Sequence, residues 1–365
     1  MNQDGSTSIG RRLYRWLDER YHLNDLVAFL GSKDVPITRM SFFYYFGGIT
    51  LFLFFVQVVT GILLLMYYVP SADEAYESVH YIMAKVPFGW LIRSIHMWSA
   101  NLMILSTMIH LVSVFYMRAY RKPRELTWIS GCMMLGLLLA FGFSGYLLPW
   151  NELAFFATRI GTEVVASIPL VGDWMAYVMR GGEDVSGTTL NRFFGLHVAV
   201  LPGVAALLVA FHLIAIQRQG MSKPTEWLNK PPEQRRRMPF FPNFLLRDLL
   251  LWFVVLNFLA ALAVFFPAHL GEKADPFAPA PAGIKPEWYF LAQYQVLKWL
   301  PPTIGPFDGD SVGMLVMSLG MLAVVLLPFL DRTPEGGPRR LWLDLVATLA
   351  LVILIIVTVL GHVLP

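Results

Sequence analysis

Two long apolar stretches each carry two histidines: RSIHMWSANLMILSTMIHLVSVFYM at 93–117 and RFFGLHVAVLPGVAALLVAFHLIAIQ at 192–217. In the first stretch, His96 and His110 are 14 residues apart. Fourteen residues of an α-helix turn through about 1400°, close to four full turns, so these two histidines share one helix face. They are about 21 Å apart along the helix axis, which is most of the apolar thickness of a membrane.

The second stretch repeats this arrangement with a slightly longer interval. His197 and His212 are 15 residues apart, which displaces them by about 60° around the helix but leaves them on roughly one side. Two such helices that face each other would place two His–His pairs at two depths. This arrangement suits two haems that are each held between two imidazoles and stacked across a bilayer.

The composition indicates a helical membrane protein with several crossings. The 365 residues are 56% hydrophobic and only 15% charged, and the mean hydropathy is +0.56. Such values are typical of polytopic membrane proteins and not of soluble domains. The single Cys132 excludes an internal disulfide and a thiolate metal cluster. We predict an all-α fold with seven transmembrane helices, at about Phe42–Tyr68, Leu91–Met117, Trp128–Trp150, Phe193–Gln217, Leu249–Phe266, Val312–Leu330 and Leu341–Leu360.

The basic residues predict the orientation of these helices. Of the 28 Lys and Arg residues, 20 lie in the N-terminal segment and in the 118–126, 218–248 and 331–341 loops, which all fall on one side. By the positive-inside rule the N-terminus is cytoplasmic, on the n side. Seven crossings then place the C-terminus outside, on the p side.

The connecting segments suggest how the chain is divided. Residues 11–30 indicate an amphipathic helix on the cytoplasmic membrane surface or, equally, an ordinary cytoplasmic cap. Residues 153–165 indicate a short helix along the outer surface. The basic, Pro-rich 218–248 loop is typical of a hinge, and contact with anionic membrane lipid explains its charge. We expect an N-terminal segment, a four-helix di-haem domain, a linker and a three-helix domain, at 1–40, 41–220, 221–246 and 247–365.

Two pairs of glycines repeat the histidine interval of 14 residues: Gly47 with Gly61, and Gly131 with Gly145. A glycine in a membrane helix usually serves close helix packing. Two pairs at the histidine spacing favour a different role, because the flat edge of a macrocycle needs backbone without side chains beside it.

Pro286-Glu287-Trp288-Tyr289 lies in the long loop before the sixth predicted helix. Taken alone, these residues favour a capped surface helix, with Pro286 at its start and Glu287 near the positive end of its dipole. The functional alternative is an acid that accepts a proton from an amphiphilic substrate at membrane-surface depth.

Zinc binding and proton relay account less well for the four histidines than haem does. Zinc needs three or four ligands that converge at one point, not pairs about 21 Å apart. A transporter that relays protons through membrane histidines remains an alternative, but it predicts neither bound haem nor paired depths.

The chain resembles the cytochrome b/b6 family from about Tyr14 to its C-terminus. The motifs that carry the resemblance are GGITLFLFFVQVVTG, FGWLIRSIHMWSAN, KPRELTWISG, GYLLPW, RFFGLHVAVLP, HLIAIQRQG and KPEWYFL. The 15-residue interval between His197 and His212, and the seven predicted helices, are similar to the b6 branch. That branch usually divides the protein into cytochrome b6 and subunit IV, so this chain resembles a fused bacterial form.

The resemblance implies two non-covalent b-type haems. His96 and His197 would ligate the p-side haem, and His110 and His212 the n-side haem. The four paired glycines would lie beside the haems, and Arg93 near a haem propionate, where guanidinium–carboxylate pairing is apt.

The resemblance also implies two quinone sites. The motif Pro286–Tyr289 would oxidise quinol at the p side, with Glu287 as proton acceptor and Tyr289 and Tyr146 lining the pocket. Asp248 and Arg218 would serve quinone reduction at the n side. An acid of the b6 branch in the N-terminal surface helix is missing here, which leaves Asp248, Asp34 or Glu226 as the proton donor.

In one respect the chain departs from the b6 branch. There, a further n-side haem is bonded to a cysteine at the position of Tyr45. The resemblance therefore gives no support for a covalent third haem and leaves a non-covalent one open.

Finally, the resemblance implies a Q-cycle enzyme in a bacterial cytoplasmic membrane. Its partners would be a Rieske iron–sulfur protein, a c-type cytochrome or an equivalent acceptor, and a second copy of the complex, with no nucleic acid. A rival within redox chemistry is a di-haem membrane anchor for a dehydrogenase or hydrogenase, which would not need the Pro286–Tyr289 motif.

Overall fold

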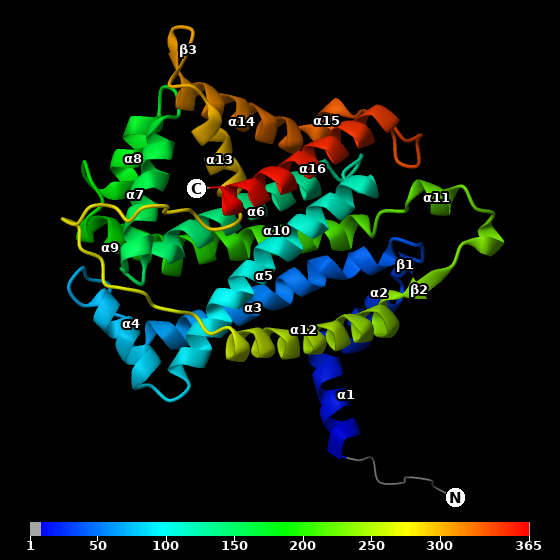
Figure 1. Cartoon of the computed structure of the whole chain (residues 1–365). Coiled ribbons are helices and arrows are strands. Elements are labelled where there is room, and N and C mark those ends of the chain that lie inside the picture. The colour runs from blue at the N-terminus through cyan, green and yellow to red at the C-terminus, as the bar shows by residue number, and fades with distance from the viewer. Residues whose placement is uncertain (1–8, 365) are drawn as a thin grey trace, which may run out of the picture.

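The computed structural model describes residues 9–364, which form a mostly helical structure (Figure 1). Among these residues, six helical segments are long and apolar enough to cross a membrane. Large apolar side chains remain exposed along them, as contact with lipid requires. The prediction of a helical membrane protein is thus confirmed. The six segments are built on α3 (Tyr45–Leu65), α5 (Gly89–Tyr116), α6 (Glu125–Leu147), α10 (Leu201–Gln219), α12 (Leu245–Phe265) and α16 (Leu341–Val363).

The sixth predicted span, Val312–Leu330, is divided in the structure. α14 (Gly309–Val325) has 17 residues, and α15 (Leu327–Leu330) follows after a break at Leu326. Pro328 in α15 has no backbone N–H to donate, so the helix cannot continue unchanged through this point. Asp308 caps the other end of α14, because its carboxylate accepts the Ser311 backbone N–H.

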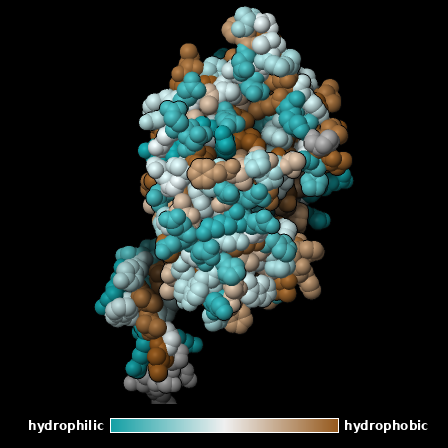
Figure 2. Space-filling view, turned by 60° about the vertical axis from the view of Figure 1, so that its left-hand side comes forward, coloured by the Kyte–Doolittle hydropathy of each residue, from teal (hydrophilic) through white to brown (hydrophobic). Residues whose placement is uncertain are grey.

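Short helices cover one end of the long helices, which we call the α7 end. They are α4 (Ala75–Ala84), α7 (Glu152–Ala166), α8 (Gly172–Arg180), α9 (Gly187–Gly195) and α13 (Leu291–Trp299), with a hairpin of β3 (Thr303–Ile304) and β4 (Phe307–Asp308). The predicted helix at 153–165 matches α7, whose start is capped by the Asn151 side chain. Figure 2 shows that this end is mostly hydrophilic, as a surface that meets water should be.

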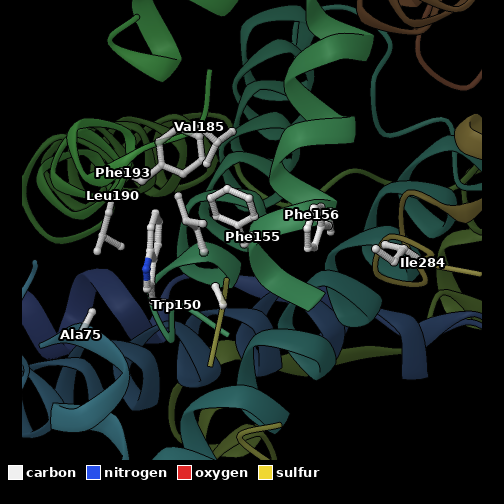
Figure 3. Packing of buried hydrophobic residues seen from close by; sticks show 11 residues of the cluster. Ala75, Trp150, Phe155, Phe156, Val185, Leu190, Phe193 and Ile284 are labelled. Atoms are coloured by element: carbon white, nitrogen blue, oxygen red, sulfur yellow. The ribbon is translucent and has the colours of Figure 1, made fainter. Parts of the chain in front are cut away.

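A buried aromatic core lies beneath the α7 end. Trp150, Phe155 and Phe193 pack together there, and Ile284 from the loop before α13 belongs to the same cluster (Figure 3). This core ties the short helices to the loop that contains Pro286–Tyr289.

The opposite end, which we call the α11 end, carries the N-terminal helices and the linker. Its elements are α1 (Ile9–Tyr21), α2 (Leu23–Gly31), β1 (Asp34–Pro36), η1 (Ser41–Tyr44), α11 (Thr225–Leu228), η3 (Pro232–Gln234), β2 (Arg237–Pro239) and η4 (Phe240–Phe244). The antiparallel pairing of β1 with β2 places Val35 opposite Met238. The all-α prediction contained neither this ladder nor the β3–β4 hairpin.

The single helix predicted over residues 11–30 is wrong. The structure breaks it at His22, whose φ of 50° lies in the left-handed region. The Asp18 carboxylate accepts the backbone N–H of Asn24 at 2.7 Å. This local bond competes with the helical pattern, and two shorter helices result.

An ionic cluster at the α11 end joins the loop between α5 and α6 to the loop before α16. The buried Arg121 guanidinium lies 3.0 Å from Asp331, and the Tyr120 hydroxyl donates to the same carboxylate at 2.7 Å. Arg124–Glu335 and Arg118–Asp344 flank this pair. The cluster therefore holds the C-terminal helices on the rest of the bundle.

We predict that Asp331→Asn destabilises the protein by about 3 kcal/mol or more near neutral pH, because it leaves Arg121 buried without a charge partner. Burial alone would raise the pKa of Asp331, but hydrogen bonds from Thr333, Tyr120 and Arg121 outweigh it and lower this pKa to about 2. The stabilisation should persist above the usual Asp pKa of about 3.9 and be lost as the pH falls towards 2.

Thermal unfolding of wild type and variant across pH measures this effect. The control is Asp34→Asn, which breaks the exposed pair with Arg237 and should cost less than about 1 kcal/mol. Equal losses from both variants would contradict a structural role for the buried cluster.

Candidate functional site

His96 and His197 face each other across the bundle. Their ring centres are 6.3 Å apart, and the ring planes meet at 69°. A metal–imidazole bond is about 2 Å long, so two imidazoles on one metal ion have ring centres roughly 6 Å apart. The two rings are therefore spaced as one ion between them requires.

The second pair lies further along the same helices. His110 is 14 residues beyond His96 on α5, about 21 Å along the axis. It is close enough to His212 on α10 for their charges to interact. Since α5 packs on α3 and α10 packs on α6, each pair lies between two packed helix pairs.

A π-helical turn explains how His197 and His212 lie on one side of their helix although they are 15 residues apart. Leu196–Val200 is π-helical and contains His197, and the Leu201 N–H donates to the Leu196 carbonyl. Pro202, which follows, has no N–H for the carbonyl an α-helical turn before it. A π turn holds one extra residue. The 15-residue interval therefore behaves like one of 14 residues, and the predicted displacement of 60° is absorbed.

Each of the four predicted glycines lies against a different histidine ring. A Cβ atom at these positions would meet the Cε1 atom of that ring. The distances are 3.1 Å for Gly47 and His110, 3.4 Å for Gly61 and His96, 3.6 Å for Gly131 and His212, and 2.6 Å for Gly145 and His197. The glycines therefore allow the imidazoles to approach the flanking helices.

Three hydroxyl groups beside these glycines contact the histidines, and the sequence patterns did not reveal them. The distances to Nδ1 are 2.9 Å from Thr60 to His96, 2.8 Å from Ser130 to His212 and 3.1 Å from Ser144 to His197. With Nδ1 occupied by a hydroxyl, Nε2 is left for a metal. The signal in the sequence is a Thr or Ser directly before the glycine.

The Pro286–Tyr289 motif packs against α5 and α6. The Trp288 indole N–H donates to Asn101 Oδ1 at 2.7 Å. The Tyr289 hydroxyl approaches Gly142 so closely that a Cβ there would lie 2.5 Å from it. The two contact residues are close to the His96–His197 pair along the chain. Asn101 is five residues from His96 on α5, and Gly142 is three residues from Gly145 on α6.

Burial perturbs both ionisable groups of this motif. It raises the pKa of the Glu287 carboxyl. Burial first, then the nearby Glu287 carboxylate and Tyr146 hydroxyl, raise the pKa of Tyr289 above its usual range. Glu287, Tyr289 and Tyr146 therefore lie close enough to influence one another electrostatically.

Two further contacts hold this motif, and nothing in their sequence context singled them out. The Asn101 amide also donates to the Met97 carbonyl at 3.0 Å, which fixes its orientation. Lys285 donates to the carbonyls of His362 and Leu364 at 2.8 and 2.5 Å, at the end of α16.

The Arg93 side chain is hydrogen-bonded to backbone carbonyl groups. Its guanidinium donates to the carbonyls of Ala268 and His269 at 3.0 and 3.1 Å. It therefore lies between α5 and the loop after α12, at the level of His96.

The residues expected to reduce quinone are placed separately. Asp248 is buried in the first turn of α12, and its carboxylate lies directly against Gly48 of α3. Arg218 is exposed near the end of α10. Within the described part of the chain, no hydrogen bond or ion pair joins them.

Tyr45 is buried, and its ring stacks on Phe244 with centres 4.7 Å apart and planes 10° apart. The position that holds a cysteine in the b6 branch is therefore filled by an aromatic stack here. Elsewhere in residues 9–364, no three His, Cys, Asp or Glu side chains gather in a group that could hold a metal ion.

Two family models match the chain. The model described as "Cytochrome b/b6/petB" matches residues 32–220, and "Cytochrome b(C-terminal)/b6/petD" matches residues 273–365. These regions are the ones that contain the four histidines and the Pro286–Tyr289 motif, respectively.

Relatives resemble the chain over most of its length or over somewhat more than half of it. A "Cytochrome bc complex cytochrome b subunit" of Chlorobaculum thiosulfatiphilum is 46% identical, over 94% of this chain and 79% of that protein. A "Cytochrome b6" of Prochlorococcus marinus is 44% identical, over 58% of this chain and 97% of that protein. A chain of the structure described as "Hyperthermophilic respiratory Complex III" has a TM-score of 0.84 at 31% identity and covers 96% of this chain and 91% of its own. The protein therefore belongs to the cytochrome b/b6 family.

Proposed function

We propose that this chain is the haem-bearing cytochrome b subunit of a bc-type quinol–cytochrome c reductase that runs a Q-cycle. The observation that carries the proposal is the pairing of four histidines on two helices, with the half-buried Glu287 in a segment that contacts α5 five residues from His96. Membership of the family supports the same conclusion, because one relative is described as the cytochrome b subunit of a cytochrome bc complex and another as cytochrome b6.

His96 and His197 hold the p-side haem, and His110 and His212 hold the n-side haem. When bound, the two haems supply one-electron carriers at two depths, so that an electron from quinol at the p side can reach quinone at the n side. The chain's own task is to keep the imidazoles oriented. The hydroxyls on Nδ1 and the glycines beside the rings support that orientation.

Quinol is oxidised at the Pro286–Tyr289 motif. Glu287 accepts a proton from the quinol, and its raised pKa suits a group that must bind and release a proton. Trp288, anchored on Asn101, and Tyr289, lodged against Gly142, hold the motif beside the p-side haem ligands. Pro286 starts the segment, and Tyr146 lines the pocket with Tyr289.

Quinone is reduced at the n side, near Asp248 and Arg218. The buried Asp248 carboxyl delivers protons from the cytoplasmic side, and the exposed Arg218 attracts the developing negative charge. Two non-covalent haems are expected and no covalent third haem, since Tyr45 has no thiol to form the bond.

We assign seven crossings, with α14 and α15 together forming one of them. The N-terminus and the α11 end are then cytoplasmic, and the α7 end and C-terminus lie outside a bacterial cytoplasmic membrane. Residues 41–220 form the di-haem unit and 247–365 the three-helix unit, joined by 221–246. A Rieske iron–sulfur protein takes the first electron from quinol and passes it to a c-type cytochrome or an equivalent acceptor. The complex is a dimer in contact with membrane lipid.

The two rival functions place different demands on the chain. A membrane anchor for a dehydrogenase or hydrogenase does not need the Pro286–Tyr289 motif with its half-buried Glu287. A proton-relaying transporter does not need imidazole rings spaced for a metal ion, and it would bind no haem.

Our first prediction for this site concerns Gly145→Ala. A Cβ there would lie 2.6 Å from His197 Cε1, so the ring must move from its ligating position. We expect the p-side haem to be lost and the n-side haem kept, which a pyridine haemochrome assay and reduced-minus-oxidised spectra would measure. Gly136→Ala on the same helix is the control, because no atom lies within 4 Å of its added Cβ. Two intact haems in Gly145→Ala would argue against His197 as a ligand.

The second prediction concerns Glu287→Gln. We expect quinol oxidation to fall by about 100-fold or more with haem spectra unchanged, because the proton acceptor is lost. Since burial raises the pKa of Glu287, the wild-type rate should rise with pH through a value above the usual Glu pKa of about 4.3, and the variant should lack this rise.

Steady-state quinol oxidation by the purified complex, measured across pH, tests this prediction. Glu272→Gln changes an exposed carboxylate in the same loop and should leave the rate and its pH dependence unaltered. Full activity in Glu287→Gln would contradict the role of Glu287 as proton acceptor, whereas loss of quinol oxidation would argue against the membrane-anchor alternative.

A further inference from the structure

The hydroxyls on the histidines follow a pattern that is broken at one position. The residue before each ring-facing glycine is Thr60, Ser130 or Ser144 in three cases, and each contacts Nδ1 of the same ring. In the fourth case the glycine is Gly47 and the residue before it is Phe46.

The three hydroxyls act as acceptors toward the imidazoles. A hydroxyl has one proton, and each of these three donates it to a carbonyl of its own helix. The acceptors are the carbonyls of Val56, Thr127 and Ala140, at 2.7, 2.9 and 2.8 Å. The oxygen lone pairs are then left to accept the Nδ1–H of the histidine. Nδ1 keeps its proton, and Nε2 is free to bind iron.

Such an acceptor changes the ligand electronically. The hydroxyl oxygen accepts a hydrogen bond from Nδ1–H, and this bond raises the basicity of Nε2. A more basic ligand favours ferric over ferrous iron. A histidine with a hydroxyl on Nδ1 therefore lowers the reduction potential of its iron, compared with the same histidine without one.

His110 lacks this acceptor. Its Nδ1 is buried and has no hydrogen-bond partner within the described residues. The Phe46 side chain packs instead against Phe42 and Phe43, with ring centres 5.8 and 5.9 Å apart. Positions 46 and 60 are separated by 14 residues, like His110 and His96. Position 46 on α3 is therefore placed relative to His110 in the same way as Thr60 is placed relative to His96.

We propose that Thr60, Ser130 and Ser144 are positioning residues that lower the reduction potential of the iron bound by their histidines, and that Phe46 withholds the fourth such bond from His110. The p-side pair then has two acceptors and the n-side pair has one. With haems bound, this difference would make the p-side iron easier to oxidise and the n-side iron easier to reduce, and so would favour passage of one electron from the first to the second with no proton or atom moved. The inference rests on the haem ligation proposed above.

Equilibrium redox titration of the two b-type absorbance changes, in the purified complex at fixed pH, tests the loss of a hydroxyl. The titration should show two one-electron steps, called waves here, one for each haem. Thr60→Val and Ser144→Ala should both raise the midpoint potential of the same wave, that of the p-side haem. Ser130→Ala should raise the midpoint potential of the other wave. We expect about a tenfold change in the equilibrium constant for each, equivalent to about 59 mV for one electron. Thr60→Ser keeps the hydroxyl and is the matched control that should not shift.

The gain of a hydroxyl tests the exception. Phe46→Ser should lower the potential of the wave that Ser130→Ala raises, while Phe46→Ala, which removes the ring without adding an acceptor, should not lower it. Equal shifts from Phe46→Ser and Phe46→Ala would overturn the role of the hydroxyl.

The outcomes separate this inference from the proposed function. A wild-type complex in which this chain binds no haem would overturn both. If both haems titrate normally and none of the hydroxyl variants shifts either potential, the inference is overturned but the proposed haem ligation is not. Shifts that pair Thr60 with Ser130, instead of with Ser144, would overturn the assignment of histidines to haems.

Discussion

An imidazole buried in a membrane helix needs partners for both of its ring nitrogens, because an unsatisfied polar atom is costly where water is absent. Much of this structure follows from that requirement at four histidines. Hydroxyls on α3 and α6 engage Nδ1 of three rings, and the neighbouring glycines let the rings approach. Nε2 is left for a partner other than these hydroxyls. The spacing of the His96 and His197 rings suits a metal ion as the remaining partner.

Helix geometry then sets the two depths. An uninterrupted α5 keeps His96 and His110 on one face, whereas the other helix needs a π turn at His197 to bring its longer interval into the same phase. The Pro286–Tyr289 motif is held near the His96–His197 pair, because Asn101 of α5 and Gly142 of α6, which contact it, lie close to His96 and Gly145 on those helices. In the proposed function, one framework would thus support both electron transfer and proton release.

The sequence was sufficient to predict that the four histidines share sides of two helices, that four glycines lie at matching positions, and where most of the long helices run. Those features depend only on residue spacing and on the length of apolar segments. Glu287 emerged from the family resemblance, as its four-residue motif favoured a surface helix. The π turn, the Nδ1 hydroxyls and the Trp288–Asn101 bond could not be predicted in this way, since each depends on contacts between distant segments. Local hydrogen bonding broke the predicted helix at His22, and strand pairing at Val35 arose between segments about 200 residues apart.

The most direct test of the account counts the haem on this chain. The purified complex would be assayed for pyridine haemochrome per mole of this chain, separated from any c-type partner, before and after extraction with acid acetone. Two haems per chain, both removed by extraction, are what the two histidine pairs and Tyr45 predict. Haem that stays on the chain after extraction would mean that a covalent anchor exists. A chain without haem would contradict the assignment of the four histidines altogether.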